Sequence, residues 1–580
     1  MRLAQTLLLA CISIAAAMQS IAADLDAVPA DPAPTGPVPA DPNSGCPPEP
    51  SAATRQRPGE EPPQRLQQPE CDPTRLPNPS TSPLPGSIPV DRWRIIDALG
   101  HPDNRVDPYN TNNVLKGDRP IWGADGFSVL TASTTSLFES RRVPVSADAA
   151  TGELDGHEQF FNSQTASIDA VLYEGDTIFR PPDYELRLTP IFNYSSTTTG
   201  AAKTTTTSVG AQALFFEKHL RDVSAQYDFD SVRIGIQPVT SDFRGFVLAD
   251  QPLGIRFFGT RDNDIYQYSA GWFRRLPKNP ARQNELGEGI PANDIVMANL
   301  YIQDLGRAGL TSELVFIYDR SRARGTHIVV GDADTTFTSG ARHDYDVVYL
   351  GYGADGHLGS LNLTGSVYEV IGRESEGVFT GRPTKVQATF AALELSRDFD
   401  WIRVRASGLY ASGDGNPSDG ESRGFDGINQ TAIFAGSDST FFIHQRLPLV
   451  LSAIDLKQRD SLFPSLRSTA DSGESNYSNP GLELLGLGSD LDLAPSLRVS
   501  FDVSHVVFAN TATLQAILGR TDIPRSIGTD ASLDALYRPF NSQNVIARLS
   551  FAKLFASPGA RNLVGGTAPV SMFFNLVLTY

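Results

Sequence analysis

The feature that most constrains the fold is an alternation of apolar and polar side chains that recurs from Phe127 to the C-terminus. In residues 231–237, for example, Val232 and Ile234 share one face of an extended chain and Arg233 lies on the other. Successive side chains of a strand point to opposite faces, so a period of two predicts half-buried strands. The same pattern recurs in residues 184–189, 402–407, 497–504 and 545–552.

The predicted strands are long for a soluble sheet. About eighteen are expected, at 126–143, 159–173, 183–196, 206–218, 222–238, 253–260, 264–275, 293–305, 309–320, 343–353, 357–371, 384–397, 400–412, 480–490, 494–508, 529–539, 543–555 and 568–580. Most cover about 11–15 residues, whereas soluble strands usually have about 5–6 and tilted membrane strands need about 9–11. The predicted fold class is therefore all-β: an antiparallel transmembrane β-barrel of roughly 16–18 strands, formed by residues 125–580.

The connections between these strands are of two kinds. Tight turns are expected at 261–263, 353–356, 397–400 and 490–493, and long polar loops at 276–292, 321–342, 413–479 and 509–528. Short turns at one end and long loops at the other are typical of outer-membrane barrels. The segment 413–479 is too long for a bare loop, and its apolar stretch 441–451 predicts a folded insert that dips into the lumen. Residues 511–518 predict a short helix.

The last strand has one apolar face and ends on an aromatic residue. That face carries Val570, Met572, Phe574, Leu576, Leu578 and Tyr580. Such a strand resembles the closing strand of Gram-negative outer-membrane β-barrels. The resemblance implies that it pairs with the first barrel strand and is read by the insertion machinery. An edge strand of a soluble sheet is the alternative interpretation.

The N-terminal region is predicted to be an export signal followed by an unfolded extension. Residues 1–22 combine Arg2, an apolar core and a small-residue exit, which indicates a cleaved signal peptide. Processing as a lipoprotein at Cys11 is the alternative. Residues 23–89 are Pro-rich and predicted to be disordered, as a spacer, a plain linker or a ligand for another envelope component. Cys46 and Cys71 lie there and could form a disulfide after export.

Residues 90–124 mix turn-forming residues with Trp and Tyr, which predicts an ordered but irregular lead-in that lines the periplasmic rim or plugs the lumen. Beyond the N-terminus no apolar run approaches the length of about 18 residues that a helical span needs. The net charge of −18 argues against nucleic acid, which requires a basic surface.

Sequence motifs for catalysis and metal binding lack their structural context. Residues 351–356 match G-x-G-x-x-G, but a strand rather than a helix follows, so a Gly-rich hairpin is expected. Residues 420–424 match G-x-S-x-G within a polar loop, where a chance match is favoured over a nucleophile elbow. Residues 414–420 could bind Ca²⁺ only loosely. No catalytic, cofactor-binding or metal-binding residue is predicted.

The face opposite the apolar one is expected to line the lumen. Its predicted basic residues are Arg187, Arg233, Arg256, Arg403, Arg405, Arg498 and Arg548, and its acidic ones are Glu185, Asp502 and Asp534. The opposite assignment would place the arginines in lipid, at about 2–4 kcal/mol each near the midplane. Two roles remain open: the arginines could favour anions, or they could pair with wall carboxylates and brace the barrel.

Together these features resemble Gram-negative outer-membrane porin-type barrels, in the alginate-export-like or an uncharacterised porin-type branch. The resemblance implies a channel for passive passage of small hydrophilic solutes, anions among them, without enzymatic activity or cofactor. It implies contact with outer-membrane lipid and lipopolysaccharide, and with the insertion machinery through the strand ending at Tyr580. The alternatives are a scaffold or export conduit that holds a periplasmic or secreted partner, and an outer-membrane hydrolase.

Overall fold

The computed structural model describes residues 113–580, with gaps at 124, 147–153, 176–180, 225–227, 280, 288, 323–328, 331–336, 339–343, 432, 450–453, 468–474 and 565–568. The predicted signal peptide, the Pro-rich segment and the cysteine pair lie outside the described residues. Of the predicted lead-in, residues 113–123 run beside the first strand, where Lys116 pairs with Val129 and Trp122 with Gly126.

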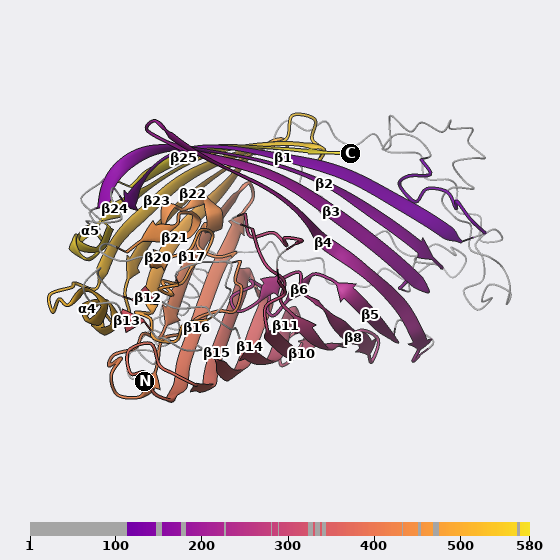
Figure 1. The fold of residues 1–580 in the computed structure, drawn as a ribbon. Helices are drawn as coiled ribbons and strands as arrows, with labels where there is room; N and C mark the ends of the chain where they lie inside the picture. Colours follow the sequence, from indigo (N-terminus) through magenta and orange to yellow (C-terminus); the bar gives the residue numbers. More distant parts are fainter. Residues whose placement is uncertain are drawn as a thin grey trace, which may run out of the picture. The chain divides into compact units, whose positions relative to one another are not determined.

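Eighteen antiparallel strands of the described chain close into a barrel, which confirms the predicted fold class (Figure 1). They are β1 (Gly126–Ser146), β2 (Leu154–Glu174), β3 (Tyr184–Thr199), β4 (Ala202–Asp222), β5 (Phe229–Ile236), β8 (Leu253–Arg261), β9 (Tyr266–Arg274), β10 (Asn293–Gln303), β11 (Leu310–Ser321), β14 (Tyr345–Leu358), β15 (Leu361–Glu374), β16 (Thr384–Phe399), β17 (Ile402–Ala411), β21 (Leu482–Ala494), β22 (Leu497–Val507), β23 (Ser526–Tyr537), β24 (Val545–Ala556) and β25 (Val570–Thr579). The seam joins the last strand to the first, from Ser133 opposite Thr579 to Arg142 opposite Val570. Figure 1 shows β25, in yellow, beside β1, in indigo.

Each predicted strand has a counterpart, but two predicted turns are wrong. Residues 353–356 lie inside β14, and the hairpin turn falls at 359–360. The glycines there make room for a neighbouring ring, because a Cβ on Gly351 would lie 2.2 Å from an atom of the Tyr368 ring. Residues 490–493 lie inside β21, and the turn falls at 495–496. Asp490 stays in the strand because its carboxylate binds Arg405 of the neighbouring strand β17.

The connections alternate between the two ends of the barrel. One end, called the turn end here, carries 175–183, 223–228, 262–265, 304–309, 359–360, 400–401, 495–496 and 538–544. The other, called the loop end, carries 147–153, 200–201, 237–252, 275–292, 322–344, 375–383, 412–481, 508–525 and 557–569. Only the β3–β4 link at the loop end is as short as a tight turn. The longest connections, 412–481 and 322–344, lie at the loop end, whereas short links predominate at the turn end.

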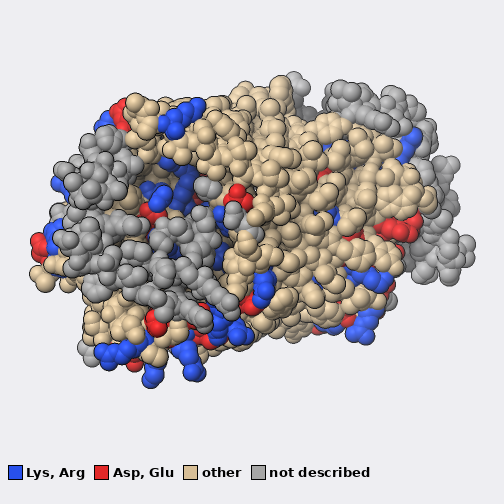
Figure 2. Space-filling model, in the orientation of Figure 1, with Lys and Arg blue, Asp and Glu red and all other residues tan. Residues whose placement is uncertain are grey.

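The outward face of the wall is apolar and exposed. Every strand contributes to it, with large side chains such as Ile234, Leu350, Leu487 and Phe574. These side chains occupy alternate positions, as the period of two in the sequence requires. Figure 2 shows a broad wall with few charged side chains, whereas charges gather in a hollow and along the edges.

Two connections from the loop end fold into the barrel: residues 237–252 and the described residues of 412–481. Together they are called the plug here. The first contains β6 (Val239–Thr240) and β7 (Ala249–Asp250). The second contains β18 (Glu421–Ser422), which pairs parallel with β16, η1 (Ser437–Ser439), α3 (Phe441–His444), β19 (Leu447–Pro448) and β20 (Asp455–Lys457). Two further pieces of the described chain, β12 (Val329–Val330) and β13 (Phe337–Thr338), form a small hairpin in 322–344.

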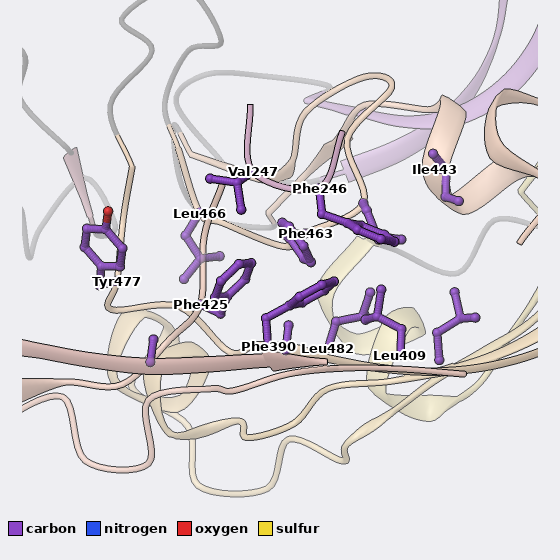
Figure 3. Close-up of a cluster of buried hydrophobic side chains, with 14 of the residues drawn as sticks. Phe246, Val247, Phe390, Leu409, Phe425, Ile443, Phe463, Leu466, Tyr477 and Leu482 are labelled. Atoms are coloured by element: carbon purple, nitrogen blue, oxygen red, sulfur yellow. The ribbon is translucent and has the colours of Figure 1, made fainter. Parts of the chain in front are cut away.

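The plug has its own apolar core, packed against the inward face of the wall. Phe390, Leu409 and Leu482 rise from β16, β17 and β21 and face plug residues such as Phe425 and Phe463 (Figure 3). The rings of Phe390 and Phe425 stack with centroids 4.8 Å apart. The plug also contacts inward side chains on other strands, which places it inside the lumen.

Two short helices belong to other loop-end connections. The helix α4 (Ala512–Leu518) confirms the helix predicted at 511–518. The second, α5 (Pro558–Val564), precedes β25. Among the residues that the structure describes, none forms a helix that is both long and apolar enough to cross a membrane.

Candidate functional site

All ten residues predicted to face the lumen lie on the inward side of their strands. They alternate with exposed apolar neighbours: Arg187, for instance, lies between Leu186 and Leu188, which are 46% and 44% exposed. The structure does not gather the ten into one ring. They divide into four groups around the wall, and each group has its own hydrogen-bond partners.

The first group lies on β2 and β3. Arg187 binds Asp169 through two hydrogen bonds, from Nε to Oδ1 at 2.8 Å and from Nη2 to Oδ2 at 2.6 Å. Thr189 donates a third bond to the same carboxylate at 2.6 Å. Glu185 lies one inward position away on the same strand. This paired geometry fixes the guanidinium plane against the wall.

The second group lies on β4, β5 and β8. Arg233 donates to Glu217, and its guanidinium carbon lies 4.3 Å from the centre of the Phe215 ring. Arg256 is directly opposite Arg233 across the β5–β8 pair. It donates from Nε to Ser269 Oγ at 2.8 Å.

The third group lies on β17, β21 and β22. Arg405 bridges two carboxylates, Asp490 at 2.6 Å and Asp502 at 2.7 Å. Arg403 and Arg498 lie nearer the turn end, where each binds a carboxylate on the preceding strand of its own hairpin. Arg403 pairs with Asp398, and Arg498 with Asp492 at 2.7 Å. These two arginines are about half exposed, whereas Arg405 is mostly buried.

The fourth group connects the wall to the plug. Arg548 of β24 donates from Nε to Asp534 of β23 at 2.6 Å. Its two terminal nitrogens bind the carboxylate of Asp438, in η1 of the plug, at 2.8 and 3.0 Å. Arg548 therefore braces the barrel and anchors the plug at the same time.

Two cavities lie beside the plug. The larger, of about 610 Å³, lies between the plug and the inward faces of β1, β2 and β25; its charged lining residues are Arg282, Asp438, His444, Arg459 and Asp460. The smaller, of about 210 Å³, is lined by Arg244, Glu394, Arg405, Asp438, Asp490, Asp502, Asp534 and Arg548. Ile433, Ser437 and Asp438 line both, so the two cavities are adjacent at this part of the plug. Figure 2 shows a hollow in which basic and acidic side chains gather.

A buried ionic cluster ties the plug to the first strand. Glu139 of β1 is completely buried and accepts hydrogen bonds from Arg459 at 3.0 Å and from Gln445. His444 Nδ1 lies 2.7 Å from Asp460 Oδ1, and its Nε2 lies 3.6 Å from Glu139 Oε1. Burial and Arg459 lower the pKa of His444, but Asp460 and Glu139 outweigh them, so that the pKa is raised above its usual value.

The plug also buries a lysine without an acidic partner among its hydrogen bonds in the described chain. Lys457 donates from Nζ to the carbonyl oxygens of Ile443, Gln445 and Gln458 at 2.8–2.9 Å. Burial lowers the pKa of Lys457 well below its usual value. The bonds to Ile443 and Gln445 hold the end of α3 against β20.

The sequence motifs for which no catalytic or metal-binding role is predicted have structural roles in the plug. Ser422, the central residue of G-x-S-x-G, lies in β18 and bonds to Glu374 and Ser478, with Oγ–Oγ 3.0 Å to the latter, rather than to an imidazole. Asp414 accepts a bond from the backbone nitrogen of Asn416 within a local turn. In the part of the chain that the structure describes, no three His, Cys, Asp or Glu side chains are placed to hold a metal ion.

Sequence reasoning missed most of the acidic partners and most of the plug core. Asp169, Glu217 and Asp490 occupy inward strand positions, so alternation could have placed them in the lumen. Their pairing with particular arginines depends on strand register, which one sequence does not reveal. Phe425 and Phe463 lie in irregular segments without periodicity, which left no signal for the core they form.

Comparisons with known proteins give structural similarity alone. No family model matches the sequence, and no curated protein matches it. Among solved structures, the chain is similar to Pseudomonas aeruginosa OccK7 (OpdD), with 11% identity, a TM-score of 0.44 and coverage of 79% of this chain and 99% of that one. For P. aeruginosa OpdK with vanillate the identity is 11% and the TM-score 0.43, with coverage of 78% of this chain and 98% of that one. For a BenF-like porin from Pseudomonas fluorescens Pf-5 the identity is 10% and the TM-score 0.43, with the same two coverages of 78% and 98%. None of these matches assigns the chain to a family.

Proposed function

We propose that this protein is an outer-membrane channel for passive passage of small hydrophilic solutes. Placement in a membrane is supported by the exposed apolar side chains on the outward face of all the strands. In water such a surface would be costly, since soluble proteins rarely expose apolar patches larger than a few hundred Å². A closed barrel satisfies its backbone hydrogen bonds without edges, which a strand protein needs in order to span lipid. Separation of turns from loops supports an outer-membrane orientation with the turn end in the periplasm.

Passage of hydrophilic solutes is supported by one observation above the others: two adjacent cavities lined by charged side chains lie beside the plug inside the barrel. An eighteen-stranded wall encloses more volume than side chains alone fill. The plug takes up part of that volume, and the proposed path runs between the two cavities along Ile433, Ser437 and Asp438. Such a path admits small solutes, and its charges replace part of their hydration. A channel of this kind requires no catalysis or cofactor.

Charge preference follows from how strongly the lumen arginines are already paired. Six of the seven bind a carboxylate, and these pairs support the bracing role. Passage of anions would depend on guanidinium groups that keep donors free beside the path. Asp438 binds both terminal nitrogens of Arg548, so this ion pair determines whether Arg548 can attract an anion.

The proposal is tested by recording current across a planar bilayer that contains the purified, folded protein. Discrete conductance steps are expected. Liposomes containing the protein should also swell in isotonic solutions of small sugars, and more slowly as the sugar becomes larger. A folded barrel that inserts but gives neither current nor swelling would overturn the channel. If such a silent barrel co-purified with a periplasmic partner, the scaffold interpretation would replace it.

The path beside Asp438 is tested with Asp438→Asn. This change releases the terminal nitrogens of Arg548, so the reversal potential in a salt gradient should move toward anion selectivity. Asp522→Asn, which removes an equal charge from an exposed position in 508–525, is the matched control and should leave the potential unchanged. Equal shifts in both variants would mean that the path does not run past Asp438.

A further inference from the structure

A row of charged side chains crosses the outward face near the loop end. Strand register places Asp294, Arg320, Asp346, Arg373 and Lys385 directly beside one another on β10, β11, β14, β15 and β16. The first part of the row is neutralised. Asp294 binds Arg274 at 2.8 Å, and Asp346 binds Arg322 at 2.5 Å and accepts a bond from Tyr318 at 2.7 Å.

The second part of the row is not neutralised. Arg373 and Lys385 are directly opposite each other, and both are exposed. Within the described chain neither forms an ion pair: Asp346 is already bound by Arg322. Strand β18 places Glu421 beside Lys385, but the carboxylate of Glu421 binds Arg423. Like charges directly opposite each other on neighbouring strands destabilise a sheet. An anion bound between the two side chains would remove this repulsion.

An apolar groove of about 800 Å³ lies deeper on the same part of the wall and crosses β10, β11, β14, β15 and β16. Its outward side chains include Leu314, Phe316, Leu350, Tyr352 and Val367, which are 41–49% exposed. Its upper part contains Glu369 and Thr389, each four residues from the basic pair along its strand. At about 3.3 Å per residue and a tilt of about 40°, this is about 10 Å deeper.

The carboxylate of Glu369 lies on the outward face of β15, between the apolar side chains of Val367 and Ile371. Glu369 and Thr389 are cross-strand partners, and Thr389 Oγ1 donates to Glu369 Oε2 at 2.8 Å. Gln387 Nε2 lies 3.5 Å from the other carboxylate oxygen. Neither contact uses all the acceptor capacity of a carboxylate, which has about four lone-pair sites. The groove therefore offers an acceptor for an N–H or O–H group a short distance below a site for an anion.

We infer that this surface, made by Arg373, Lys385, Glu369 and the groove below them, binds a phosphorylated acyl lipid of the outer leaflet. The phosphate lies between Arg373 and Lys385, an amide or hydroxyl group near the lipid's glycosidic core donates to Glu369, and one acyl chain fills the groove. Arginine is suited to phosphate because its planar guanidinium donates two parallel hydrogen bonds. This inference rests on the proposed placement in the outer membrane, with the loop end outward.

A second copy of the chain fits this surface less well. Two copies in one membrane are related by an axis along the membrane normal, so a residue meets others at its own depth. The acidic residues of the row, Asp294 and Asp346, are both already bound. Glu369 is deeper and cannot reach the basic pair of a neighbouring copy. A phosphate supplies the missing negative charge at the required depth.

The test is native mass spectrometry of the detergent-purified full-length protein, titrated with diphosphoryl lipid A, with phosphatidylglycerol and with phosphatidylcholine. Wild-type protein should keep one lipid A molecule under activation that removes phosphatidylcholine. In the double variant Arg373→Gln/Lys385→Gln the affinity should fall about thirtyfold, since each basic side chain near an anionic lipid surface contributes a factor of about five. In Glu369→Gln the preference for lipid A over phosphatidylglycerol should decrease.

The matched control is Lys218→Gln/Lys553→Gln, which removes the same charge from outward positions elsewhere on the barrel. It should retain wild-type affinity. Equal loss in both double variants, or no loss in either, would overturn the site, as would a wild-type preparation that binds phosphatidylcholine as tightly as lipid A. Dimers or trimers joined by a disulfide in Leu350→Cys would assign the groove to a second copy.

Bilayer conductance is measured on the same preparations and separates this inference from the proposed function. Because Arg373 and Lys385 lie outside the lumen, the double variant should conduct as the wild type does. Lipid A retention by a protein without conductance would preserve the lipid site and overturn the channel. Conductance by a protein that does not retain lipid A selectively would preserve the channel and overturn the lipid site.

Discussion

The inner faces of two parts of the wall differ in composition although their outer faces are alike. On β1–β3 the inward side chains are mostly hydroxyl, amide or charged, such as Ser163, Asn193 and Ser195, which hydrogen-bond to one another across the strands. On β14–β17 the inward side chains near the loop end are large and apolar, such as Tyr349 and Phe390, and they are buried by the plug.

This difference shows what determines where a barrel of this size stays open. A wall with a polar inner face can be exposed to water at little cost in free energy, and the larger cavity lies beside β1 and β2. A wall that is apolar on both faces needs lipid outside and protein inside. The plug satisfies the second requirement, and the larger cavity remains on the polar side.

The largest effect is expected when one large side chain is removed from each part of the wall. Phe390→Ala should destabilise the plug by about 3–5 kcal/mol, because it leaves a cavity among Phe246, Phe425 and Phe463. Phe161→Ala on β2 should cost much less, because Phe161 lines the larger cavity and is only half-buried. Protease cleavage within 412–481 and chemical unfolding measure both. Equal losses would show that the plug core is not the more stable part.

A smaller effect is expected where the plug meets the polar wall. His444 is surrounded by Asp460 and Arg459 of the plug, by Glu139 and Arg141 of β1, and by the Phe573 ring. Folding raises the pKa of His444, so its contribution is complete below the pKa of an unfolded histidine, about 6.5, and is lost as pH rises through the folded value.

Conductance noise and protease cleavage of the plug should therefore increase in the wild type as pH rises above about 6.5. His444→Gln should remove this pH dependence and cost about 2 kcal/mol, the usual contribution of hydrogen bonds to a charged group. Cleavage that stayed independent of pH in the wild type would show that the cluster does not hold the plug.

The smallest effect is expected for an ion pair within the polar part. Arg187→Gln removes a guanidinium that is 39% exposed from Asp169, which is 21% exposed. Partly exposed pairs contribute about 0–1 kcal/mol, so the change should lower the unfolding midpoint only slightly. A loss as large as that of Phe390→Ala would mean that bracing by arginine, rather than the plug core, dominates the stability of the barrel.

Much of the wall could be predicted from the sequence, because strand alternation is a local property. The faces of β5 and β25 follow from Val232 and Met572 and from their neighbours at alternate positions. The turn after β14 was misplaced because Gly351 and Gly353 resemble turn residues. They leave room for side chains of the neighbouring strands and of the plug. This role depends on tertiary contacts, which the local sequence does not show.

The site was less predictable, because its geometry depends on contacts distant in sequence. The inward position of Arg548 follows from its neighbour Leu549, but its bond to Asp438 spans 110 residues and depends on how the plug folds. Alternation carries no information about such pairs. The position of the path beside the plug could not be predicted for the same reason.

The seam between β25 and β1 has a consequence for biogenesis. The ribosome makes the plug before the final five strands, and the cylinder is completed only when residues 570–579 reach residues 133–142. A chain truncated before Val570 would have two unpaired edges, on β24 and β1, and a slit between them. Because the first and last strands are both needed for closure, neither end of the barrel sequence can be shortened without opening the side of the barrel.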